Sequence, residues 1–174
     1  MQQEAGMTFK DNWEKSLTQY NLADPVIRKM LKIAYPNKHV NHYEIIAGGC
    51  ANINIKADLL GLESPIIIRV YLRDPKAAYK EQKIGQLLSA KVPLPQIYQI
   101  HDTSGYTFAV AEFLPGTTLR DLLLNDKKID IATIMFKVGE TLAHIADTKF
   151  ASSGFFNEHL EITEPITQDG MIAF

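Results

Sequence analysis

The pattern of hydrophobic and polar residues changes its period several times along the chain. From Asn52 to Leu60 apolar and polar residues alternate strictly, which predicts a β-strand with one buried face. The run PIIIRVYL, Pro65–Leu72, is almost continuously apolar and β-branched, and it predicts a central strand covered on both faces. Tyr43–Ala47 predicts a shorter strand, and the Gly48-Gly49 pair and the GLES stretch supply turns. Together these segments predict a three-stranded meander.

Helical spacing precedes and follows these strands. Residues 9–35 predict helix, with Asp24 as an N-cap and Pro25 at the first helical position. The stretch RDPKAAYKEQKIGQLLSAK predicts a second helix that Asp74 caps and Pro75 starts. The VPLP stretch then forces extended backbone, since each proline disfavours a helical residue before it.

The second half of the chain predicts two more strands and two helices. The strands are Gln96–His101 and Tyr106–Phe113, joined by the turn-forming DTSG stretch. A short helix follows from Thr117 or Thr118, and Ile129–Thr148 has the period of a long amphipathic helix. The remaining tail shows no strong period. This order predicts an α+β fold in which a five-stranded antiparallel sheet carries one packed helix.

Composition and charge narrow the classes of partner. Hydrophobic residues make up 46% and charged residues 22% of the 174-residue chain, which is typical of a globular domain. The net charge of −2 provides no basic field for nucleic acid or an anionic membrane, so we expect neither as a partner. The single cysteine, Cys50, excludes a disulfide framework and favours the cytoplasm. No apolar run has the length needed to cross a bilayer.

One charged residue interrupts the most apolar strand. Arg69 stands within IIIRVYL, where a buried charge is costly unless it is paired or binds a ligand. Glu81 lies on the apolar face of the next predicted helix, so the two side chains could meet, and the guanidinium could then hold two phosphate oxygens. The alternatives are a purely structural ion pair, or an edge strand whose Arg69 faces solvent.

The order of these features resembles the aminoglycoside phosphotransferase and choline kinase family, which is related to protein kinases. The stretch IIIRVYLRDPKAAYKEQKIGQLLSAKVPLPQIYQI is similar to the family's third strand, helix and exit, and AVAEFLPGTTLRDLL is similar to its hinge. The resemblance covers about Tyr43 to Pro165. It implies a kinase-like nucleotide-binding lobe in 41–114 and a hinge with the first helices of an incomplete C-terminal lobe in 115–174. The helical pattern described above assigns residues 1–40 to a separate N-terminal helical segment.

The resemblance also implies which residues bind the nucleotide, ATP or GTP. Gly48, Gly49 and the residues up to Asn52 would form the loop over the phosphates, with backbone N–H groups as donors. Arg69 stands where protein kinases usually have a lysine, and Glu81 would be its carboxylate partner. The backbone of the hinge would hydrogen-bond the adenine, at Glu112, Phe113 and Leu114.

A catalytic loop is missing from the sequence. No histidine lies in the motif that supplies such enzymes with a catalytic Asp and a following Asn, and His101-Asp102 falls in the DTSG turn. We therefore assign no catalytic and no metal-binding residue, and expect Mg²⁺ and a small hydroxyl-bearing acceptor only with the missing half. The chain would be a truncated gene product, a single lobe, or a fragment that works with another chain.

Two alternatives to this hypothesis stay open. One is a non-catalytic binding or assembly module on the same lobe, and the other is an unrelated α+β binding domain. The wide apolar stripe of Ile129–Thr148 also predicts self-association, as a homodimer, because soluble monomers rarely expose so large a patch. The stripe could instead fold back on the N-terminal helices around Trp13 and Met30.

Overall fold

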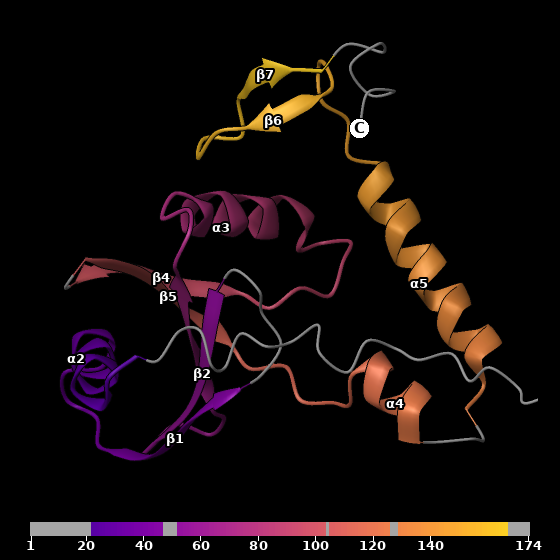
Figure 1. Ribbon diagram of the computed structural model, residues 1–174. Helices are drawn as coiled ribbons and strands as arrows, with labels where there is room; N and C mark the ends of the chain where they lie inside the picture. Colours follow the sequence, from indigo (N-terminus) through magenta and orange to yellow (C-terminus); the bar gives the residue numbers. More distant parts are fainter. Residues whose placement is uncertain (1–21, 47–51, 104, 126–128, 167–174) are drawn as a thin grey trace, which may run out of the picture. The chain divides into compact units, whose positions relative to one another are not determined.

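The computed structural model describes residues 22–46, 52–103, 105–125 and 129–166 (Figure 1). The described residues fall into two compact units. The first lies within Met1–Pro75 and His101–Val110, and the second within Lys76–Ile100 and Ala111–Phe174.

Most of a five-stranded sheet lies in the first unit. Its strands follow the spatial order β1-β2-β3-β5-β4, and β1, β2 and β3 pair in antiparallel fashion. The strand bounds are β1 Val40–Ile46, β2 Asn52–Leu59, β3 Ile66–Tyr71, β4 Ile97–Thr103 and β5 Tyr106–Glu112. The predicted α+β fold with a five-stranded sheet is therefore confirmed. β5 lies between β3 and β4, which the chain order does not reveal.

Alternation along β2 sets the two faces of the sheet. Every second residue of β2 is buried, and these residues stand opposite the buried residues of β3, as in the pairs Ile55–Ile68 and Ile53–Val70. Helix α2 (Asp24–Ala34) packs its apolar side on this face, where Met30 is fully buried (Figure 1). The predicted central position of β3 is confirmed by the strand order.

The start of α2 differs from the prediction by one residue. Ala23, with extended backbone, is the N-cap, so Asp24 is the first helical residue and Pro25 follows it. The assignment of Asp24 as N-cap was wrong, because its side chain does not cap the helix. Its carboxylate instead accepts hydrogen bonds from Arg28 Nε, at 2.7 Å, and from the Tyr43 hydroxyl. The rest of the predicted N-terminal helix, residues 9–21, lies outside the described residues.

The second unit contains three helices and a β-hairpin. Their bounds are α3 Ala77–Leu88, α4 Leu119–Asn125, α5 Ile131–Ala146, β6 Gly154–Phe156 and β7 Ile162–Pro165. α3 begins two residues after Pro75, and Lys76 rather than Asp74 is its N-cap residue. The hairpin of β6 and β7 was not predicted, because three- and four-residue strands are too short to show an alternating pattern.

Helix α5 has a well-defined beginning and an open surface. The Asp130 carboxylate accepts hydrogen bonds from the backbone N–H of Thr133, at 3.0 Å, and from its hydroxyl, at 2.7 Å. These bonds lower the pKa of Asp130. None of the residues of α5 is buried.

In the part of the chain that the structure describes, no helix is both long and apolar enough to span a membrane.

Candidate functional site

The face of the sheet opposite α2 carries the polar residues of the central strands. Asn54 of β2 stands directly opposite Arg69 of β3, and Asn52 stands opposite Tyr71. Arg69 is half-buried, and its guanidinium carbon lies 5.7 Å from the centre of the Tyr71 ring. β3 has a strand on either side, so the alternative of an edge strand with a solvent-facing Arg69 was wrong. This face holds a cation on the central strand of the sheet.

The predicted phosphate loop precedes this face along the chain. Gly48 and Gly49 lie outside the described residues. Asn52, the last residue of the predicted loop, is the first residue of β2 and is half-buried. The predicted loop is therefore followed directly by β2, the strand that pairs with β3. Asn52 lies two residues before Asn54, which is paired with Arg69.

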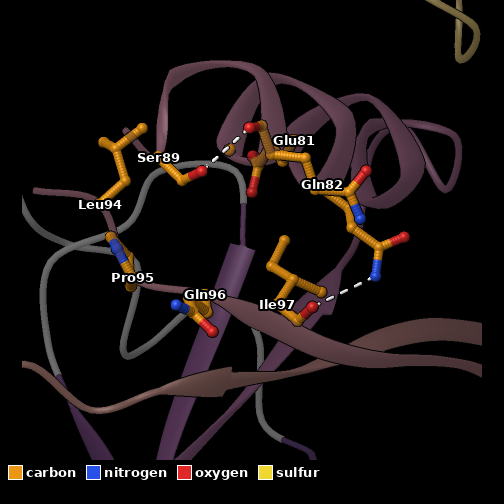
Figure 2. Close-up of a pocket in the computed structure, with 9 residues that line it drawn as sticks. Glu81, Gln82, Ser89, Leu94, Pro95, Gln96 and Ile97 are labelled. Atoms are coloured by element: carbon orange, nitrogen blue, oxygen red, sulfur yellow. Dashed lines mark hydrogen bonds between the residues drawn. The ribbon is translucent and has the colours of Figure 1, made fainter. Parts of the chain in front are cut away.

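Glu81 lies in the other compact unit, on α3. Its side chain is half-buried and lines a cavity of about 250 Å³ between α3 and the segment that leads into β4 (Figure 2). The close-up shows Glu81 on the side of α3 that faces Leu94, Pro95 and Gln96. Because Arg69 and Glu81 belong to different units, their pairing stays a prediction.

The predicted hinge residues follow the end of β5. The backbone N–H of Glu112 donates to the carbonyl of Gln96 at 2.8 Å, and the N–H of Gln96 donates to Glu112 Oε2 at 3.2 Å. The N–H of Glu112 is thus engaged within the protein. Phe113 and Leu114 follow outside any helix or strand, and the Leu114 side chain is exposed. Adenine recognition by these residues stays a prediction.

The remaining His-Asp pair has a structural role. The Thr107 hydroxyl donates to Asp102 Oδ1 at 2.5 Å across the β4–β5 turn. The His101 ring packs on Phe108, with 5.2 Å between the ring centres. These contacts agree with the predicted turn role. Across residues 22–46, 52–103, 105–125 and 129–166, no three His, Cys, Asp or Glu side chains gather as a metal site would need.

Sequence reasoning missed contacts between the β6–β7 loop and α3. Lys76 Nζ donates to Glu158 Oε1 at 2.8 Å, and Lys83 Nζ lies 3.1 Å from His159 Nδ1. The hydrogen bond from Lys76 lowers the pKa of Glu158. The Asn157 side chain shapes the loop, because its Oδ1 accepts from the N–H groups of His159, at 2.8 Å, and Glu161, at 3.0 Å. An asparagine at a turn was the only local signal for this loop.

Comparisons with known proteins agree with this architecture. A profile of the phosphotransferase enzyme family matches residues 42–165. The solved structure of aminoglycoside phosphotransferase APH(4)-Ia is similar over 87% of this chain and 50% of its own, with a TM-score of 0.68 and 19% identity. A thermostable mutant of that enzyme, in a ternary complex with ADP and hygromycin B, matches over 84% and 48%, with a TM-score of 0.65 and 20% identity. Another mutant, in a ternary complex with AMP-PNP and hygromycin B, matches over 77% and 44%, with a TM-score of 0.60 and 20% identity.

These matches cover only part of the solved structures. The chain spans about half the length of the solved structures it matches. No curated protein sequence matches it. At this level of identity the structural likeness establishes the fold, while the profile covers most of the chain and establishes the family. The chain therefore belongs to the phosphotransferase enzyme family, and its five-stranded sheet has the architecture of a kinase-like N-terminal lobe.

Proposed function

We propose that this chain is the nucleotide-binding portion of a small-molecule kinase related to the aminoglycoside phosphotransferases. The complete enzyme would transfer the γ-phosphoryl group of ATP or GTP to a hydroxyl group of a small acceptor. The observation that carries the proposal is Arg69, a half-buried cation on the central strand of the sheet, opposite the strand that follows the predicted phosphate loop. A cation in this place suits the charge of a nucleotide better than it suits an apolar core.

The polar face offers a direct way to hold phosphate. The planar guanidinium of Arg69 would donate two parallel hydrogen bonds to phosphate oxygens, which a lysine cannot do. Stacking on Tyr71 restricts the guanidinium, so less conformational entropy is lost on binding. Glu81, if it pairs with Arg69, would orient the guanidinium. The backbone N–H groups around Gly48, Gly49 and Asn52 would supply further donors.

The relatives support a nucleotide as the ligand. Structures of APH(4)-Ia mutants contain ADP or AMP-PNP together with hygromycin B. We propose the same class of nucleotide for this chain and leave its acceptor as a hydroxyl-bearing small molecule. Mg²⁺ would neutralise the phosphate oxygens, and in this proposal it binds only with the other half of the enzyme. The site residues would be Gly48, Gly49, Asn52, Arg69, Glu81 and the backbone of Glu112, Phe113 and Leu114.

Nucleotide binding to the 174-residue chain tests the proposal. Isothermal titration with ATP and with GTP should show binding, and Arg69→Ala should weaken it by about tenfold or more, since a hydrogen bond to a charged group contributes about 1.5–3 kcal/mol. Arg69→Lys should retain part of the affinity. Lys56→Ala is the matched control. Lys56, on β2, lies on the same face of the sheet as Arg69, but its ammonium pairs with Glu44. Equal losses for Arg69→Ala and Lys56→Ala, or no binding of either nucleotide, would contradict the proposal.

A second candidate function is a non-catalytic assembly module, and the surface of α5 favours it. Ile131, Met135, Val138, Leu142 and Ile145 are all exposed and follow each other at spacings of four and three residues. This spacing places them in one stripe along the helix, as in the seam of a short coiled coil. We propose that two copies of the chain associate through this α5 stripe, in a reducing cytoplasm to which a single cysteine is suited.

A further inference from the structure

A cavity of about 250 Å³ lies within the second compact unit. Five of its lining residues belong to one side of α3 or follow that helix directly, and four belong to the segment entering β4 (Figure 2). The Gln82 amide donates to the carbonyl of Ile97 at 3.2 Å, which ties the helix to the opposite wall. The lining residues are Glu81, Gln82, Gly85, Gln86, Ser89, Leu94, Pro95, Gln96 and Ile97.

One wall residue of this cavity, Gly85, is a glycine in the middle of α3. Gly85 lies within the helix Ala77–Leu88, where glycine is less stabilising than alanine. Packing does not require this glycine, because a Cβ atom built on it would have no heavy atom within 4 Å. Because Gly85 lines the cavity, we expect a larger side chain at this position to occupy part of it. Glycine at this position therefore leaves space for a ligand, although it lowers the stability of the helix.

The charges around the cavity select the ligand. The carboxylate of Glu81 is part of the wall, and that of Glu112 accepts from the backbone N–H of Gln96, another wall residue. None of the nine described lining residues is Lys, Arg or His, so the lining itself supplies no positive charge to an anion. A carboxylate accepts about four hydrogen bonds, so Glu81 can receive a ligand donor in addition to the interaction it already makes and to the proposed bond from Arg69.

The lining residues other than Glu81 are apolar or carry neutral polar groups, which indicates the other chemical groups of the ligand. Leu94, Pro95 and Ile97 form an apolar side, whereas the Gln82, Gln86 and Gln96 side chains offer amide groups. We propose that this cavity binds a small primary ammonium compound that combines a short aliphatic group with an amide or hydroxyl group. Its ammonium would donate to Glu81, its aliphatic group would pack on the Leu94–Ile97 segment, and its polar group would bond a glutamine amide.

Valinamide is a probe with these three parts, and two compounds of nearly the same volume are its controls. Isovaleramide lacks only the ammonium group, and valine replaces the amide with a carboxylate. At pH 6.5 the α-amino group of valinamide is protonated. Saturation-transfer NMR and isothermal titration on the 174-residue chain, without nucleotide, should show that valinamide binds about tenfold more tightly than isovaleramide, because the ammonium–carboxylate hydrogen bond is charge-assisted. Valinamide should also bind about tenfold more tightly than valine, because the valine carboxylate would bring a second negative charge beside Glu81. Equal affinity for valinamide and isovaleramide would overturn the proposal.

Substitutions in the protein locate the site. Gly85→Leu should reduce the affinity for valinamide by at least about tenfold, because the new side chain fills the cavity. Gly139→Leu is the matched control, since Gly139 lies in the middle of α5 and also has open space around it. Glu81→Gln should keep the cavity but remove the preference for valinamide over isovaleramide. Circular dichroism reports whether Gly85→Leu is folded, and Glu81→Gln tests the proposal if it is not. Unchanged preference in Glu81→Gln would overturn the ammonium contact.

Discussion

Single residues on the central strands divide the sheet into a core face and a polar face. Ile68 is fully buried opposite Ile55, whereas the next residue, Arg69, is half-buried opposite Asn54. Neighbouring residues of a strand point to opposite faces, so a charge and a core side chain can be adjacent in sequence. The strand therefore carries a nucleotide-binding candidate without disturbing the core that α2 covers.

This division predicts different costs for two adjacent isoleucines. Ile68→Ala should lower the free energy of unfolding by about 2–5 kcal/mol, because it leaves a cavity in a fully buried site. Ile67→Ala, on the half-buried face opposite Lys56, should cost clearly less. Urea denaturation of both variants measures the difference. If the two substitutions cost the same, the assignment of the core face is wrong.

Elements far apart in the sequence meet where the β6–β7 loop contacts α3. Asn157 organises the loop, and Glu158 and His159 reach Lys76 and Lys83 on the helix. These residues lie at the beginning and the middle of α3, on either side of Glu81 in sequence. The loop therefore restrains the helix whose carboxylate is the predicted partner of Arg69.

Acid should weaken this contact. The pKa of Glu158 is lowered from its ordinary value of 4.5 by the hydrogen bond from Lys76. The contact thus stabilises the folded chain fully above pH 4.5 and is lost as the pH falls through the lowered pKa. An NMR titration of the Glu158 carboxyl carbon should give a midpoint below 4.5, and Lys76→Ala should raise that midpoint. Lys137→Ala, which breaks the separate Lys137–Glu140 pair, should not move it.

At the scale of the whole molecule, helix α5 exposes several large apolar side chains. Phe136 and Leu142 expose 66% and 59% of their surface, although both are large apolar side chains. Water contact of this extent is unfavourable, and covering the surface would contribute about 25 cal/mol for each Å² removed from water. Such a surface is typical of an interface, either with a second copy or with another part of a larger assembly.

Light scattering at micromolar concentration tests the proposed dimer. The wild-type chain should give about twice its mass of 19.6 kDa. Leu142→Glu, in the α5 stripe, should yield the monomer, because two buried carboxylates would repel each other. His144→Glu, which lies away from the stripe on the same helix, should leave the dimer intact. A clean monomer of the wild-type chain would refute association through α5.

The same 174-residue chain should show no measurable phosphotransferase turnover. Phosphoryl transfer depends on positioned metal ions and on a group that receives the acceptor's proton, and the sequence carries no motif that supplies them. An assay of ATP consumption with aminoglycosides, choline and homoserine as acceptors measures this, with Arg69→Ala as the control for contaminating activity. Turnover that Arg69→Ala abolishes would show that this chain is catalytic by itself.

The sequence by itself determined the elements whose side chains repeat with a clear local period. The alternation of β2, the apolar run of β3 and the heptad-like spacing in α5 are each contained in a few consecutive residues, so they could be predicted. Arg69 could be singled out for the same reason, because a charge within an apolar strand is a local anomaly. The order of features along the chain was sufficient to indicate the family.

Only the tertiary structure decided which segments come together. Placing β5 between β3 and β4 depends on pairing between distant segments, which no local pattern encodes. The contacts of Glu158 and His159 with α3 and the cavity beside Gly85 are likewise made by residues separated along the chain. In sequence, Gly85 is only a weak helix position. Its role depends on the cavity beside it, because the wall opposite the helix is formed by Leu94–Ile97, which follow later in the chain.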